Sequence, residues 1–156
     1  MNPLFTEILL GALAALLVVA AVIDARTFTI SNRLTLAVAL LAPVYWWSAG
    51  LAFWPVIATH VAAAGGIFVL LALAFYAGMM GGGDVKLAAA LALWLSPLGS
   101  LHFLLFMSVA GGFLTLIIVV AHRLRSREGR PEIPYGIAIA IGGLATLAQR
   151  FLNQFA

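Results

Sequence analysis

Long apolar runs constrain this chain more than any other feature of its sequence. Several approach the roughly 20 residues that a helix needs to cross a bilayer. They cover residues 4–23, 34–49, about 54–77, about 84–96, about 101–121 and about 135–152. Hydrophobic residues make up 65% of the chain and charged residues only 8%, whereas soluble domains have roughly 45–50% and about 25%. We therefore expect an all-α fold, a polytopic membrane bundle of about six transmembrane helices.

The length of 156 residues predicts a single integral-membrane domain, residues 1–156, without a separate soluble module. A cleaved signal peptide is the alternative for the first run, but no basic residue precedes it. The chain has no cysteine, which excludes disulfides, thiolate metal sites and a cysteine nucleophile. Its net charge of +3 comes from dispersed basic residues, so we expect no nucleic acid partner.

The basic residues orient the expected helices. With the N-terminus outside, the loops after the first, third and fifth runs face the cytosol, where positive charge accumulates. These loops contain or flank seven of the eight basic residues: Arg26, Arg33, Lys86, Arg123, Arg125, Arg127 and Arg130. Only Arg150 falls on the outer side. Four tryptophans also fall toward that side, as an interfacial aromatic belt would: Trp46, Trp47, Trp54 and Trp94.

Two aspartates lie at the cytosolic side of this arrangement. Asp24 ends the first run, and Asp84 begins the fourth after three glycines that allow sharp turns and close approach. An acid at the start of a membrane segment is costly and indicates a functional site. Two carboxylates held about 3 Å apart share one proton, so one can accept a proton from water while the other donates to a carbonyl oxygen. This chemistry is that of an aspartic peptidase.

Two other interpretations of the acids stay open. Asp84 could be the N-cap of the fourth helix, Asp24 could orient a helix end, and Lys86 could extend to lipid headgroups. Alternatively, the chain could be a small transporter or ion-conducting protein whose acids relay protons or bind a cation. A conducting protein needs polar groups across the whole membrane, whereas both aspartates lie at one face.

Other catalytic patterns are missing from the sequence. His60, His102 and His122 fall at different depths without helical zinc-site spacing, so we expect no metal. No serine lies in a Gly-x-Ser-x-Gly elbow, and the glycine run lacks the ending of a phosphate loop. Three glycine pairs within the runs indicate close helix packing: Gly65-Gly66, Gly111-Gly112 and Gly142-Gly143.

Three motifs resemble those of the type IV prepilin peptidases, a family of GxGD intramembrane aspartic peptidases. The segment Gly81-Gly82-Gly83-Asp84-Val85-Lys86-Leu87 resembles the family's Gly-x-Gly-Asp-x-Lys-Leu motif. Asp24 followed by Ile30-Ser31-Asn32 resembles its first motif, in which an Asn follows the Asp by eight residues within an Ile-Pro-Asn triplet. Pro134-Tyr135-Gly136 with Ala138 resembles the opening of its last helix. Ser31 stands in place of the usual proline and should loosen the loop.

The resemblance implies that Asp24 and Asp84 are the catalytic pair and that no cofactor is needed. It implies substrate-binding or site-shaping roles for further residues: Gly81, Gly82, Gly83, Lys86, Asn32, Pro134, Tyr135 and Gly136. The match is closest to short, peptidase-only members that serve Tad/Flp-type pili in the bacterial inner membrane. Such a protein would remove the short basic leader of a prepilin or pseudopilin at the cytosolic face. It would not methylate the new end, because it lacks the cysteine-bearing insertion of longer members.

Overall fold

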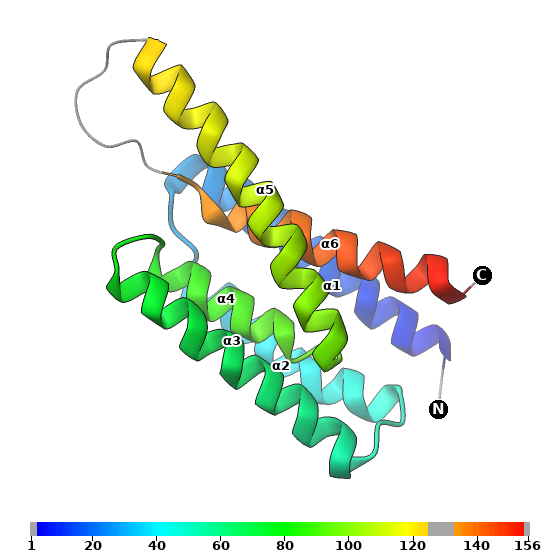
Figure 1. Ribbon diagram of the computed structural model, residues 1–156. Helices are drawn as coiled ribbons and strands as arrows, with labels where there is room; N and C mark the ends of the chain where they lie inside the picture. The colour runs from blue at the N-terminus through cyan, green and yellow to red at the C-terminus, as the bar shows by residue number, and fades with distance from the viewer. Residues whose placement is uncertain (1–2, 125–132, 155–156) are drawn as a thin grey trace.

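The computed structural model describes residues 3–124 and 133–154, and these ranges contain helices and connections but no strand. The helices follow the apolar runs in order (Figure 1). They are α1 (Pro3–Thr27), α2 (Asn32–Ser48), the short π-helical turn η1 (Phe53–Ile57), α3 (Ala58–Tyr76), α4 (Gly82–Ala92), α5 (Pro97–Leu124) and α6 (Tyr135–Gln154). The prediction of an all-α helical bundle is confirmed.

Four helical stretches are long and apolar enough to cross a membrane. They are Pro3–Thr27, Phe53–Tyr76, Pro97–Leu124 and Tyr135–Asn153. Helix α2 has 17 residues with Pro43 inside it, and α4 has only 11. At 1.5 Å per residue, α4 is about 16 Å long, half of the roughly 30 Å hydrocarbon core. The fourth apolar run therefore yields a helix shorter than expected, and most of that helix packs against protein, since Leu87, Ala88 and Leu91 are fully buried.

The helices form two groups of three (Figure 1). In one group α6 packs between α1 and α5, and in the other α4 packs against α2 and α3. Contacts of α1 with α2 and of α4 with α6 join the two groups. The end of α1 and the start of α4 therefore lie at the same end of the bundle, which brings one acid from each group to the junction.

The same end of the bundle carries most of the basic residues that the structure describes. Arg26 lies in the last turn of α1, Lys86 near the start of α4, and Arg123 in the last turn of α5. Arg150 lies near the end of α6, at the opposite end. Three further arginines used for the orientation lie outside the described residues: Arg125, Arg127 and Arg130. The outside location of the N-terminus stays a prediction.

The prediction that all four tryptophans form an interfacial belt is only partly correct. Trp94 is 1% exposed and donates from Nε1 to the carbonyl of Val38 at 2.9 Å, so it is a core residue that ties α2 to the end of α4. Trp46 is half-buried and also donates to a backbone carbonyl. Trp47 and Trp54 are strongly exposed, as a membrane interface requires.

The glycine pairs differ in their role. A Cβ at Gly142 would lie 2.8 Å from the backbone nitrogen of Met107, and one at Gly143 would lie 2.7 Å from the side chain of Leu91. These two glycines let α6 approach α5 and α4 closely. Three others have open space at that position, and for them the packing interpretation is wrong: Gly65, Gly66 and Gly112.

Two matched substitutions test this difference. Gly142→Ala should lower the free energy of unfolding by about 1–3 kcal/mol, because backbone atoms of α5 would have to move. Gly112→Ala should leave it unchanged or raise it by up to about 1 kcal/mol, because alanine is the better helix former and meets nothing. Unfolding of the detergent-solubilised protein in a denaturant titration measures both. Equal effects would contradict the packing assignment.

Candidate active site

Asp24 lies within α1, one turn before the helix ends. The sequence predicted that the loop starts at residue 24, but the helix continues to Thr27, whose hydroxyl donates to the carbonyl of Ile23 at 2.9 Å. The chain then reverses at Phe28, whose φ of 51° lies in the left-handed region that a bulky residue rarely adopts. Asp24 therefore projects from a rigid helix, and its side chain is 2% exposed.

The carboxylate of Asp24 is fixed by the first turn of α6. The backbone N–H of Gly136 donates to Oδ2 of Asp24 at 2.7 Å. A Cβ on Gly136 would lie 2.8 Å from both Cβ and Oδ2 of Asp24, so a residue without a side chain is required for this approach. The bond also satisfies an N–H at a helix start, which has no partner within the helix.

Asp84 occupies the third position of α4 and is 8% exposed. Gly81 is the N-cap, not Asp84, and its N–H donates to Oδ2 of Asp84 at 3.1 Å. This hydrogen bond is one half of a capping box. The prediction that Asp84 caps the helix is therefore correct for its Oδ2, but Asp84 does so from the third position of α4 and not as the N-cap. The other oxygen, Oδ1, is buried without a hydrogen-bond partner among the described residues. A buried oxygen without a partner lowers stability, and capping does not explain it.

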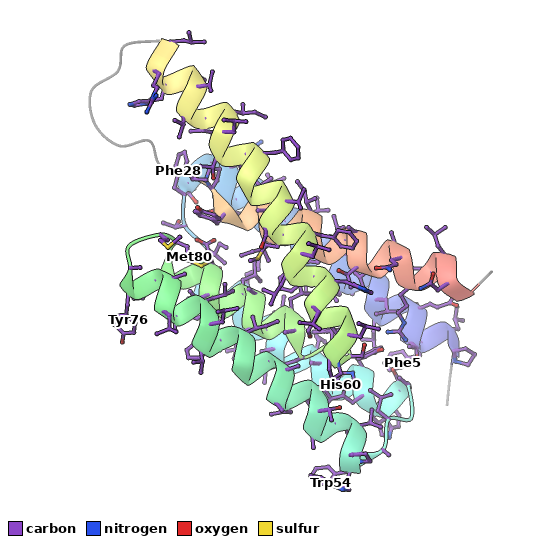
Figure 2. All side chains as sticks on the ribbon, viewed as in Figure 1. Phe5, Phe28, Trp54, His60, Tyr76 and Met80 are labelled. Carbon is purple, nitrogen blue, oxygen red and sulfur yellow. The ribbon has the colours of Figure 1, made fainter. Side chains whose placement is uncertain are left out.

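Both aspartates line one cavity of about 430 Å³. Its walls come from the end of α1 with the following turn, from the segment before α4, and from the start of α6. Figure 2 shows Phe28 and Met80 near one another at this end of the bundle, and both side chains belong to the cavity wall. The cavity thus combines two carboxylates with apolar side chains.

The environment of Asp84 favours its protonated form. Asp84 lies outside the four helices that can cross the membrane. Burial raises the pKa of Asp84 to about 6, the negative charge of nearby Asp24 also raises it, and the hydrogen bond from Gly81 opposes both. Like charges in a shared site raise a carboxyl pKa in this way. The pair is therefore able to hold one proton in mildly acidic solution, as general acid–base chemistry requires.

The other glycines of the motif serve close packing. A Cβ at Gly81 would lie 2.8 Å from Oδ2 of Asp84, and a Cβ at Gly83 would lie 3.2 Å from Ile30 in the turn after α1. At Gly82 the nearest atom would be in the ring of Phe75, at 3.4 Å. Gly81 and Gly83 thus let the start of α4 press against its own carboxylate and against the turn that follows Asp24.

Lys86 and Asn32 meet each other but not the acids. Lys86 Nζ donates to Asn32 Oδ1 at 3.2 Å. Both line a different cavity, apolar and about 520 Å³ in volume, between α2, α3 and α4. Side chains two residues apart on an α-helix point in directions that differ by about 200°. Lys86 therefore lies on the face of α4 away from Asp84. Neither side chain lines the acid cavity, and a site role for the two residues stays a prediction.

Ser31 does not loosen the loop as expected. Its hydroxyl accepts a hydrogen bond from the N–H of Leu34 at 3.3 Å and caps α2. Its φ of −71° is one that proline would also adopt. The serine therefore keeps the backbone geometry that proline would impose.

The start of α6 lies at the acid cavity, and the structure adds residues there that the sequence analysis did not select. Pro134 is buried directly before α6, Tyr135 lines the acid cavity, and Gly136 binds Asp24. No pattern in the sequence selected the apolar residues of the same wall: Phe28, Met79, Met80 and Ile133. Met79 and Met80 directly precede the glycine run, so their position was the available signal.

Among the described residues, no three His, Cys, Asp or Glu side chains gather as metal ligands.

Comparison with known proteins identifies the family. The model of the type IV leader peptidase family matches residues 11–116, more than half of the chain, and this range holds Asp24, Asn32 and the whole glycine motif. Neither the curated proteins nor the solved structures gave a match. The family match favours a peptidase over the transporter alternative and agrees with a multi-pass arrangement of apolar helices. The chain belongs to the type IV leader peptidase family.

Proposed function

We propose that this peptidase is an aspartic-type endopeptidase with Asp24 and Asp84 as its catalytic pair. Its substrates would be Tad/Flp-type prepilins or pseudopilins, which lose a short basic leader at the cytosolic face of the bacterial inner membrane. The observation that carries the proposal is the single cavity lined by both carboxylates, in which Oδ1 of Asp84 has no partner among the described residues.

The geometry suits a division of labour between the two acids. Asp84 is the better holder of the shared proton, because its pKa is raised to about 6. It would donate that proton to the oxygen of the scissile carbonyl. Asp24, oriented by the Gly136 amide, would accept a proton from the attacking water. The proton on Asp24 would then pass to the leaving amine as the C–N bond of the tetrahedral intermediate breaks, while a hydroxyl of the intermediate returns a proton to Asp84 as the new carbonyl forms.

The surroundings of the acids fit a leader peptide followed by an apolar helix. The carboxylates attract a basic leader, and Phe28, Met79 and Met80 offer an apolar wall. The substrate helix would lie in the bilayer beside the bundle, which puts the scissile bond at the depth of the acids. We propose a single domain that cleaves without N-methylation, since the chain contains no cysteine of the kind found in the methylating insertion.

Neutralising either acid tests the pair. Asp24→Asn and Asp84→Asn should each lower the rate of leader removal by at least about 10²-fold, because each variant loses one proton-transfer step. Asparagine keeps an oxygen that can accept the helix-start N–H, so folding should be retained. Cleavage of a purified Flp-type prepilin is followed by gel shift and mass spectrometry.

Glu7→Gln is the matched control, since Glu7 is an exposed acid at the other end of the bundle. It should cleave like the unmodified protein. Full activity of both aspartate variants would show that the acids are only structural.

Gly136 offers a test of carboxylate position. Gly136→Ala should lower cleavage by about tenfold or more, because the new Cβ would displace Asp24 and small misplacements of a catalytic group are costly. Gly11→Ala is the control within α1, since nothing lies within 4 Å of that position. If both alanine variants cleave at the same rate, the Gly136 contact does not position the acid.

The charge coupling between the acids predicts a pH dependence. Asp84 should lose its proton as pH rises through about 6, so its protonated-carboxyl infrared band should disappear there. Because the folded-state pKa is raised from 3.8, the folded protein binds more protons between these values, and stability should fall as pH rises from about 4 to about 6. In Asp24→Asn the titration should move to lower pH, since the nearby negative charge is gone. An unchanged midpoint would refute the coupling. The spectrum of Asp84→Asn identifies the band.

A further inference from the structure

We propose that a second cavity, at the end of the bundle opposite the two aspartates, binds the phosphate group of an anion. This site is separate from the acid pair and does not depend on the proposed peptidase mechanism. The phosphate could belong to an anionic phospholipid headgroup or to free inorganic phosphate. The two sources share the chemistry that the cavity offers, and the experiment below separates them.

The cavity has a volume of about 510 Å³ and a one-sided charge. Its walls come from the ends of α2 and α6, the start of α3 and the junction between α4 and α5. Arg150, His60 and His102 line it, together with polar uncharged groups, and no Asp or Glu among the described residues does. Figure 2 places His60 at the end of the bundle that carries Phe5 and Trp54, away from Phe28 and Met80. A cavity with this lining suits an anion.

Arg150 is held in position by Tyr45, and among the described residues most of its N–H donors have no other hydrogen-bond partner. Its Nη1 donates to the hydroxyl of Tyr45, and its guanidinium carbon lies 5.5 Å from the centre of that ring. Tyr45 is 2% exposed and stacks on Trp94, so the support is rigid. A guanidinium has five N–H donors, and its planar fork matches two phosphate oxygens.

A purely structural role does not account for Arg150. An arginine near a helix end can stabilise the helix dipole and reach the membrane surface. That role needs no cavity and no buried aromatic support. Glu7 lies in a neighbouring cavity that Arg150 also lines, yet no ion pair joins them within the described residues. The positive charge therefore has no carboxylate partner in the part of the chain that the structure describes.

Two further features point into the same cavity. His60 is 6% exposed and donates from Nδ1 to the carbonyl of Val56 at 2.9 Å, so its Nε2 is left to accept a hydrogen bond from a hydroxyl of the ligand. Ser96, directly before α5, and Gly99, in its first turn, also line the cavity, and the Gly99 N–H donates to the Ser96 hydroxyl at 3.1 Å. The start of a 28-residue helix carries partial positive charge and favours an anion.

Gln149 indicates what lies beside the phosphate. It lines the cavity, and its side-chain Oε1 is buried without a partner among the described residues. A hydroxyl next to the phosphate would supply the missing donor. The glycerol headgroup of phosphatidylglycerol carries both groups.

The test uses the full chain in a non-ionic detergent with three soluble probes. These are dihexanoyl phosphatidylglycerol, inorganic phosphate and dihexanoylglycerol, which has the same acyl chains without phosphate. A ligand that binds only the folded state raises the melting temperature in a saturable manner. We expect a saturable rise with phosphatidylglycerol and none with dihexanoylglycerol. A rise with inorganic phosphate alone at the same concentration would assign the site to free phosphate.

Substitutions locate the site. Arg150→Gln should weaken phosphate-dependent binding by about tenfold or more, because it removes a charge-assisted contact. His102→Gln should weaken it by about fivefold, the loss expected for one hydrogen bond. Arg123→Gln, at an exposed arginine near the other end, is the matched control and should bind like the unmodified protein.

Two results would overturn the proposal. The first is an unmodified protein that responds to neither phosphate-bearing probe. The second is unchanged affinity in the folded Arg150→Gln and His102→Gln variants, and His102→Gln decides alone if Arg150→Gln does not fold. Leader cleavage is measured separately, so failure of the peptidase mechanism would leave this result unaffected.

Discussion

The arrangement of this protein depends on two hydrogen bonds from backbone amides to buried carboxylates. Gly136 donates to Asp24 and thereby joins the end of α1 to the start of α6, while Gly81 donates to Asp84 and begins α4. A carboxylate in apolar surroundings is costly unless donors satisfy it, and a helix start has N–H groups that need acceptors. Each bond meets both needs. Because a carboxylate has two oxygens, capping a helix leaves one oxygen for chemistry, and the structural and catalytic interpretations are compatible.

The candidate site is assembled from segments that are far apart in the chain. Asp24 and Asp84 lie within the range that the family model matches, whereas Gly136 and Tyr135 lie beyond it. The two groups of helices each contribute one acid, and α6 completes the wall between them. The last helix is therefore part of the site as well as of the scaffold, because its first turn supplies the donor that orients Asp24.

The sequence predicted the helical bundle and the meeting of the two acids, because apolar length and charge bias are local properties of a membrane chain. It could not predict that α4 is short, that Trp94 is buried or that Gly65 has no close neighbour. These features depend on which helices pack against one another. The periodicity of apolar residues along the sequence does not determine which helix becomes the neighbour. Lys86 shows the same limit. Its position two residues after Asp84 suggested a place beside the acids, but the rotation of the helix turns its side chain toward the cavity between α2, α3 and α4.

The short, enclosed α4 has a consequence for how the protein responds to different lipids. A helix that faces lipid must tilt or distort the bilayer when its length does not match the membrane thickness. Most of helix α4 packs against protein, with Leu87, Ala88 and Leu91 fully buried, so it is largely isolated from that adjustment. The depth of Asp84 relative to Asp24 is then set by contacts among the helices. Thin and thick membranes should therefore leave the spacing of the two acids the same, even where the outer helices tilt to different extents.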